Sequence, residues 1–162
     1  MRVDFRIGLF VGSAAAIAIG FYCIWLWQEE RQVARHAENL FHRIEAKNWS
    51  AVEDLIAPDY TDQWGQDRAL VLERMRLVLG YGHNFQLHTA DANCRIENGV
   101  GIWRGRIAIE GADTELIVAV KERVNSLPTP FELRWRRRSG KPWDWKLVRV
   151  SNPELEIPAG FD

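Results

Sequence analysis

The chain has 162 residues, of which 47% are hydrophobic and 27% charged, and its formal net charge is -1. This composition is typical of a folded chain with one domain, and it excludes a largely disordered protein or a strongly basic nucleic-acid-binding protein. The two cysteines, Cys23 and Cys94, lie in an apolar segment and in the polar remainder of the chain, so neither a disulfide framework nor a zinc site is predicted.

The first predicted element is a membrane-spanning helix over residues 7–27. This stretch has no charged residue, and at about 1.5 Å per residue a helix of this length crosses a hydrocarbon core of about 30 Å. Aromatic residues gather at its C-terminal end, where rings favour the headgroup layer, and no small-residue cleavage site follows. We therefore expect a signal anchor rather than a cleaved signal peptide.

The chain is expected to divide into a short tail, the anchor, one α+β domain and a second tail, at residues 1–6, 7–27, 28–152 and 153–162. The very short leading tail favours an N-terminus on the inner side of the membrane. The expected location is the inner (cytoplasmic) membrane, with a single pass and the domain outside the cytoplasm.

Helices are predicted first in the domain. Apolar residues at helical spacing indicate an amphipathic helix from about Glu29 to Lys47. Ser50 and Glu53 form a capping-box pattern for a short helix that Pro58 ends. Asp67 is the expected N-cap of a third helix that ends at Gly80.

Strands are predicted in the second half, where apolar and polar residues alternate. The apolar residues change parity near His88 and Thr89, which indicates a bulge and a curved sheet. Turn residues between the segments favour an antiparallel meander. The five predicted strands lie around residues 90–96, 103–109, 116–120, 131–136 and 143–147.

This order of elements resembles the NTF2-like (SnoaL-like) superfamily over roughly residues 30–152. The likeness is carried by the segment Ala51–Tyr60, by the helix after Asp67 and by the Trp-rich stretches Phe131–Arg138 and Trp143–Val150. It implies an α+β cone in which N-terminal helices pack on a curved antiparallel sheet. Some members use the pocket of that cone for isomerisation, dehydration or cyclisation, and others use the domain for binding or assembly.

Asp62 is the candidate catalytic residue, because related enzymes place a proton-abstracting carboxylate near this position. Aromatic neighbours such as Tyr60 and Trp64 can raise the pKa of such a carboxylate. The alternative is a turn aspartate whose oxygens accept hydrogen bonds from local backbone amides.

Four tryptophans on apolar strand faces can line a ligand pocket or fill a core: Trp103, Trp135, Trp143 and Trp145. Together with Tyr60, Asp62 and Trp64, the residues Trp103 and Trp135 are the candidates for the pocket wall. The histidine pairs His36/His42 and His83/His88 point apart on their predicted elements, so we expect no metal site, and no motif indicates a cofactor.

A basic stripe is predicted on the solvent face of the last strands. It consists of Arg134, Arg136, Arg138 and Lys146. It can meet lipid headgroups or an acidic partner, or it can simply keep the sheet soluble.

Two hypotheses of function follow. The first is a membrane-anchored, non-enzymatic module that binds a protein partner or a second copy of itself. The alternative is a small-molecule pocket, or a lyase or isomerase that uses Asp62.

Overall fold

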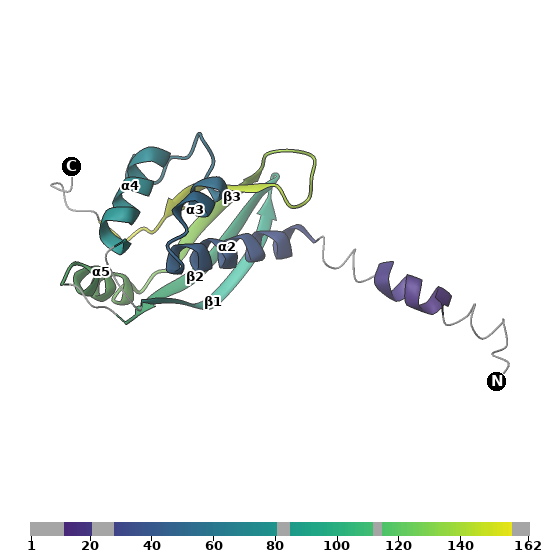
Figure 1. The fold of residues 1–162 in the computed structure, drawn as a ribbon, viewed down its shortest axis with the longest axis horizontal. Coiled ribbons are helices and arrows are strands. Elements are labelled where there is room, and N and C mark those ends of the chain that lie inside the picture. Colours follow the sequence, from purple (N-terminus) through teal and green to yellow (C-terminus); the bar gives the residue numbers. More distant parts are fainter. Residues whose placement is uncertain (1–11, 21–27, 81–84, 112–114, 157–162) are drawn as a thin grey trace.

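The computed structural model describes residues 12–20, 28–80, 85–111 and 115–156 (Figure 1). Most of the predicted anchor lies outside these ranges, although residues 12–20 are helical. Across the described ranges, no helix combines the length and the apolar character needed to cross a bilayer.

Helices and a four-stranded antiparallel sheet form the domain, and consecutive strands are neighbours in the order β1-β2-β3-β4. Figure 1 shows α2 and α3 lying across one face of the sheet, with α4 and α5 at the end away from the start of α2. The predicted α+β class, with helices packed on an antiparallel sheet, is confirmed. The elements are α2 (Glu29–Glu45), α3 (Trp49–Leu55), α4 (Arg68–Leu79), β1 (Gln86–Glu97), β2 (Val100–Glu110), α5 (Glu115–Asn125), β3 (Phe131–Arg137) and β4 (Trp145–Ser151).

Helix α2 is the amphipathic helix that the sequence predicts. Its apolar residues recur three and four positions apart, which places them on one face toward the sheet. The buried residues on that face are Val33, Ala37, Leu40, Phe41 and Ile44.

The caps of the next two helices show one correction and one agreement. The N-cap of α3 is Asn48, not Ser50, because the Asn48 Oδ1 accepts the Ala51 N–H at 3.2 Å. The predicted cap of α4 is confirmed, since Asp67 Oδ1 accepts the Leu70 N–H at 2.9 Å.

The strand predicted around residues 116–120 is wrong, because this segment belongs to helix α5. Five alternating residues fit either period, whereas Ile117, Val120 and Val124 repeat at helical spacing. Ile117 is fully buried. At the end of the helix, the Asn125 side chain accepts the Ile109 N–H at 2.8 Å and donates to the Ile109 carbonyl at 3.0 Å, which fastens α5 to β2.

The predicted bulge exists but lies later in β1. Pairing with β2 shifts between Ala90 and Asn93, and Asp91 has a left-handed φ of 54°. The turn from β1 to β2 is as predicted, because Asn98 and Gly99 have φ of 50° and 77°, the values that a tight hairpin turn requires.

The last strand begins two residues later than predicted, at Trp145. Trp143 therefore lies in the β3–β4 loop and is 57% exposed, so it lines no pocket and belongs to no core. The prediction failed because the alternation of Trp143 with Trp145 continues from the strand into the loop.

Candidate ligand-binding site

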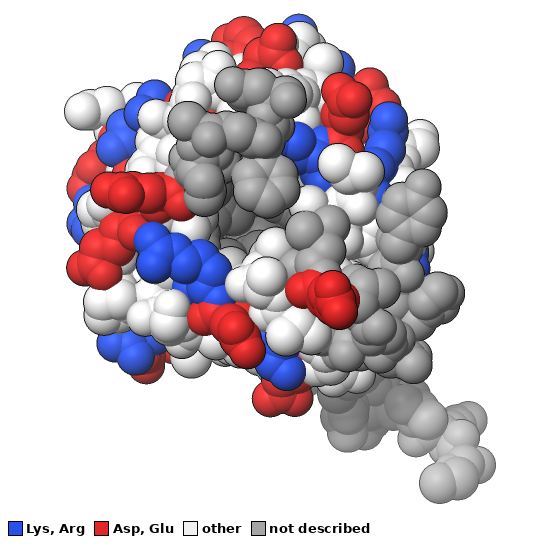
Figure 2. All heavy atoms as spheres, turned by 90° about the vertical axis from the view of Figure 1, so that its left-hand side faces the viewer, with Lys and Arg blue, Asp and Glu red and all other residues white. Residues whose placement is uncertain are grey.

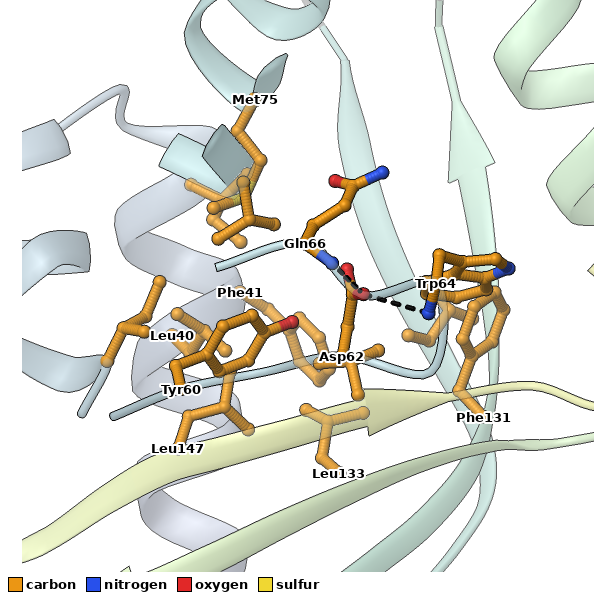
Figure 3. Close-up of a pocket in the computed structure, with 15 residues that line it drawn as sticks. Leu40, Phe41, Tyr60, Asp62, Trp64, Gln66, Met75, Phe131, Leu133 and Leu147 are labelled. Carbon is orange, nitrogen blue, oxygen red and sulfur yellow. Dashed lines mark hydrogen bonds between the residues drawn. The ribbon is translucent and has the colours of Figure 1, made fainter. Parts of the chain in front are cut away.

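A cavity of about 240 Å³ lies between α2, α4, the loop after α3 and the sheet (Figure 3). Most of its wall is apolar. Figure 3 shows Leu40 and Phe41 of α2, Met75 of α4, and Leu133 and Leu147 of the sheet around it. The wall also includes side chains with polar atoms, namely Tyr60, Asp62, Trp64 and Gln66.

Asp62 is 3% exposed and reaches the cavity from the loop after α3. Its Oδ1 accepts the Trp64 N–H at 2.9 Å and the Gln66 N–H at 2.8 Å (Figure 3). The Asp62 N–H in turn donates to the Gln66 carbonyl at 3.1 Å. Asp62 is thus a turn aspartate bonded to local amides and also a residue of the cavity wall. Because Oδ1 accepts both bonds, Oδ2 is the carboxyl oxygen that can serve a ligand.

Burial sets the electrostatics of this site. It raises the pKa of Asp62 above its ordinary value, although the bonds from Gln66 and Trp64 and the charges of Arg149 and Arg74 offset part of the effect. Burial, together with the negative charge of Asp62, also raises the pKa of Tyr60. The Tyr60 phenol is therefore protonated near neutral pH and can donate a hydrogen bond beside a carboxyl group that can accept one.

The loop that carries Asp62 runs along the outer edge of β4. The Thr61 N–H donates to the Val148 carbonyl at 3.2 Å, and the Gln63 N–H donates to the Val150 carbonyl at 3.1 Å. These backbone bonds pair the edge strand, so the loop has a fixed position beside the cavity.

Asn152 is a second anchor of this loop and is completely buried. Its backbone N–H donates to Gln63 Oε1 at 2.9 Å, and its carbonyl accepts the Gln63 side-chain amide at 2.5 Å. Its side-chain Oδ1 accepts the N–H groups of Glu154 and Leu155, at 2.9 and 3.0 Å, and the Thr129 hydroxyl at 3.2 Å.

Trp64 is tied to the same segment, because its indole N–H donates to the Leu155 carbonyl at 2.8 Å. Residues 153–155 therefore pack on the domain, whereas the sequence placed them in a separate tail. Sequence reasoning missed Asn152, and the signal available was the Asn-Pro pair, which favours a turn held by the asparagine side chain.

Two of the three tryptophans predicted for the pocket, Trp103 and Trp135, do not lie in the cavity wall, whereas Trp64 does. Trp103 is 3% exposed and packs edge-on against Phe41, with ring centroids 5.4 Å apart. Trp135 is fully buried and packs edge-on against the His36 ring, with the ring centroids 5.9 Å apart. Both residues, like Trp145, belong to the hydrophobic core, as the alternative interpretation expected.

Most side chains of the predicted basic stripe form ion pairs or hydrogen bonds with other residues of the domain. Arg134 binds the buried Glu132 at 2.7 Å, Arg136 pairs with Asp59, and Lys146 donates to the Asp54 carbonyl at 2.5 Å. Burial alone would raise the pKa of Glu132, but bonds from Arg134 and Arg104 lower it below its usual value. Arg138, the last member, is exposed in the β3–β4 loop.

The described histidines lie apart. The His36 Nδ1 is 2.7 Å from the Gln32 carbonyl oxygen on α2, and the His88 Nε2 is 3.2 Å from Glu110 at the sheet. His42 lies near Glu45, and His83 is outside the described residues. In the described ranges, no group of three or more His, Cys, Asp or Glu side chains is arranged to hold a metal ion.

No family model and no curated protein matches this sequence. Solved structures do share its fold, and one is an NTF2-like protein from Cytophaga hutchinsonii, with a TM-score of 0.52 and 15% identity over 73% of this chain and 91% of that one. The domain has an NTF2-like fold.

A proposed dehydratase of the NTF2-like family from Streptomyces avermitilis has a TM-score of 0.52 and 13% identity over 75% of this chain and 91% of that one. Bd1075 from Bdellovibrio bacteriovorus has a TM-score of 0.56 and 9% identity, and the match covers 75% of this chain but 40% of that longer one. At these identities the likeness extends to the fold alone.

Proposed function

We propose that the NTF2-like domain binds a small, mainly apolar compound in the cavity and that Asp62 orients it. The observation that carries the proposal is that an apolar cavity reaches a buried carboxyl group. Ligand sites typically combine apolar walls with a few polar groups that fix orientation.

The size of the cavity limits the ligand. Its volume of about 240 Å³ lies below the range of about 300–1,000 Å³ for drug-sized ligands. It exceeds the roughly 150 Å³ of an engineered apolar cavity that binds benzene. A compound with one or two rings, or a short acyl group, has the appropriate size.

The polar groups indicate what the ligand presents. Asp62 Oδ2 can accept a hydrogen bond, and the protonated Tyr60 phenol points toward Asp62 (Figure 3) and can donate one. A hydroxyl group on an otherwise apolar compound satisfies both, whereas a carbonyl group can accept only the hydrogen bond from Tyr60.

Native mass spectrometry of the full-length protein, extracted gently from its own membrane, tests this proposal. We expect a small added mass that disappears in Val71→Trp, because Val71 lines the cavity on α4. Leu77→Trp is the matched control, since Leu77 is on the same helix but 57% exposed. A spectrum with no small adduct in the wild type, or with one that survives Val71→Trp, contradicts the proposal.

A second candidate is proton abstraction by Asp62, with Tyr60 donating to the oxygen of the substrate. It is favoured by the adjacency of a carboxyl whose pKa is raised and a phenol that is protonated. Incubation of cyclic ketones in D₂O with the wild type and with Asp62→Asn tests it. Deuterium incorporation at the carbon beside the carbonyl is expected with the wild type only, and equal incorporation with both proteins contradicts this role.

Membrane anchoring remains part of the proposal and is supported by the sequence of residues 7–27. We propose a single pass through the inner membrane, with the domain on the outer side. Resistance to alkaline extraction tests the anchor, and a reporter fused after Asp162 tests the orientation. A protein partner or a homo-oligomer is likewise a proposal, which a protein-sized addition in the native mass spectrum would support.

A further inference from the structure

We propose that the end of the domain where α2 begins is a docking surface for phospholipid headgroups, with Trp143 as its apolar contact. This surface consists of the β3–β4 loop, residues 138–144, and the first turn of α2. The proposal rests on the proposed membrane anchor, because the anchor brings this end of the domain to the bilayer.

Chain connectivity limits the distance between the surface and the membrane. One residue, Gln28, separates the predicted span from the first residue of α2. Two peptide units reach at most about 7 Å. The first turn of α2 must therefore lie beside the headgroup layer if residues 7–27 span the bilayer.

The β3–β4 loop is held next to that turn. Arg137, at the end of β3, forms an ion pair with Glu29, and its guanidinium lies 5.0 Å from the ring centre of Trp145. Figure 1 shows the loop between β3 and β4 at the same end of the domain as the start of α2. The loop and the predicted end of the span thus share one side of the molecule.

Hydrogen bonds within the loop keep it in one conformation. The Arg138 N–H donates to the Asp144 carbonyl at 2.8 Å, and the Asp144 N–H donates to the Lys141 carbonyl at 3.2 Å. The indole of Trp145 donates to the Pro142 carbonyl at 2.9 Å. This ordered loop leaves the Trp143 side chain 57% exposed instead of packing it on the core.

The side chains around Trp143 suit the interface of a bilayer. Arg138 and Lys141 are exposed in the same loop. Basic residues are attracted to an anionic membrane surface, and indole rings favour the headgroup level. Acidic groups are also present: Glu29 is paired with Arg137, the first turn of α2 adds the exposed Glu30, and the loop adds Asp144. At the opposite end of the domain, acidic and basic side chains are interspersed (Figure 2).

Depth-dependent quenching in vesicles tests the proposal on the full-length protein. Cys23 and Cys94 are replaced by alanine, and an environment-sensitive dye is attached at Gly140→Cys, where an added Cβ meets nothing within 4 Å. Ser126→Cys carries the dye as the matched control. It follows directly after α5, which Figure 1 shows at the end of the domain away from the start of α2. The vesicles contain phosphatidylcholine with or without phosphatidylglycerol, and brominated lipid is the quencher.

The expected result is a blue shift and quenching at position 140, stronger with phosphatidylglycerol, and neither effect at position 126. Trp143→Ala combined with Arg138→Glu and Lys141→Glu should remove the effect at position 140. Equal signals at the two positions, or no signal at position 140 in protein that floats with the vesicles, would overturn this inference but leave the membrane anchor in place. If shielding of the dye from water increases with the density of protein on the vesicles and does not depend on brominated lipid, the surface contacts a second copy of the protein instead of lipid. Protein that fails to float would overturn the anchor and this inference together.

Discussion

The two halves of the interior differ in how they are filled, although the same helix and the same sheet enclose both. Under the N-terminal half of α2, Val33 and Ala37 pack against the fully buried side chains of Trp135 and Trp145. Gly101 allows a close approach there, because an added Cβ would lie 2.2 Å from a methyl group of Val33. This half is closed.

Under the C-terminal half of α2, the sheet side of the cavity is lined by Ile107, Phe131, Leu133 and Leu147, while Trp103 packs on Phe41 outside the cavity wall. The cavity lies between these side chains and α4. The buried carboxyl of Asp62 lies in this open half. The comparison teaches that the way side chains pack under α2, and not the fold alone, decides where the domain can receive a ligand.

The largest expected effect comes from opening the closed half. Trp135→Ala should lower the free energy of unfolding by about 3–5 kcal/mol, because it leaves a large cavity in a packed core. Chemical denaturation of the full-length protein in nanodiscs measures it. Trp135→Phe is the control and should cost less, since the indole N–H of Trp135 has no hydrogen-bond partner in the described structure. Equal losses for the two variants would show that this half is not tightly packed.

A second prediction concerns the approach of α2 to the sheet. Gly101→Ala should cost about 1–3 kcal/mol, because its methyl group would overlap the Val33 side chain. Combining it with Val33→Ala should cost less than the sum of the two single changes when all are compared by denaturant unfolding. Strict additivity would contradict the proposed contact.

The third prediction concerns the support of the open half. Asn152→Ala should cost about 1–3 kcal/mol, because it removes a fully buried side chain that accepts the N–H groups of Glu154 and Leu155. It should also loosen the Asp62 loop, which hydrogen exchange at the amides of Gln63 and Trp64 would detect. Unchanged protection of these amides would mean that the loop is held by β4 alone.

The smallest expected effect is the pH dependence that Asp62 contributes. Burial raises its folded-state pKa above the ordinary value of 3.8, so the folded state retains the proton to a higher pH than the unfolded state. The stability that this proton contributes is complete below pH 3.8 and is lost as the pH rises through the raised pKa. Asp62→Asn keeps an oxygen for the Trp64 and Gln66 amides and should not show this decline. Parallel profiles of unfolding free energy against pH for the two proteins would contradict the assignment.

The sequence predicts the fold well where a pattern is long. The 17 residues of α2 show a clear helical period, and the Asn98-Gly99 pair favours the positive φ values of a tight turn. It fails in α5, where five alternating residues fit both periods and packing on β2 through Asn125 selects the helix.

The candidate site was predictable in part. Tyr60, Asp62 and Trp64 lie in the cavity wall, as expected from their place before the third helix. Trp103 and Trp135 do not, because alternation along a strand shows which face is apolar but not whether a helix covers it. Asn152 was missed, since its bonds to Gln63 join positions 89 residues apart.

The most direct test of the central claim uses the methionine methyl groups. The chain has two methionines, and Met75 lines the cavity while Met1 is the first residue. Full-length protein with ¹³C-labelled methionine methyls, held in nanodiscs, is titrated with p-cresol, and p-xylene serves as the isosteric probe without a hydroxyl group. The account predicts a saturable shift of the Met75 signal alone, tighter for p-cresol, with the preference reduced in Asp62→Asn and the response abolished in Val71→Trp. A Met75 signal that does not respond, or that moves together with Met1, would contradict it.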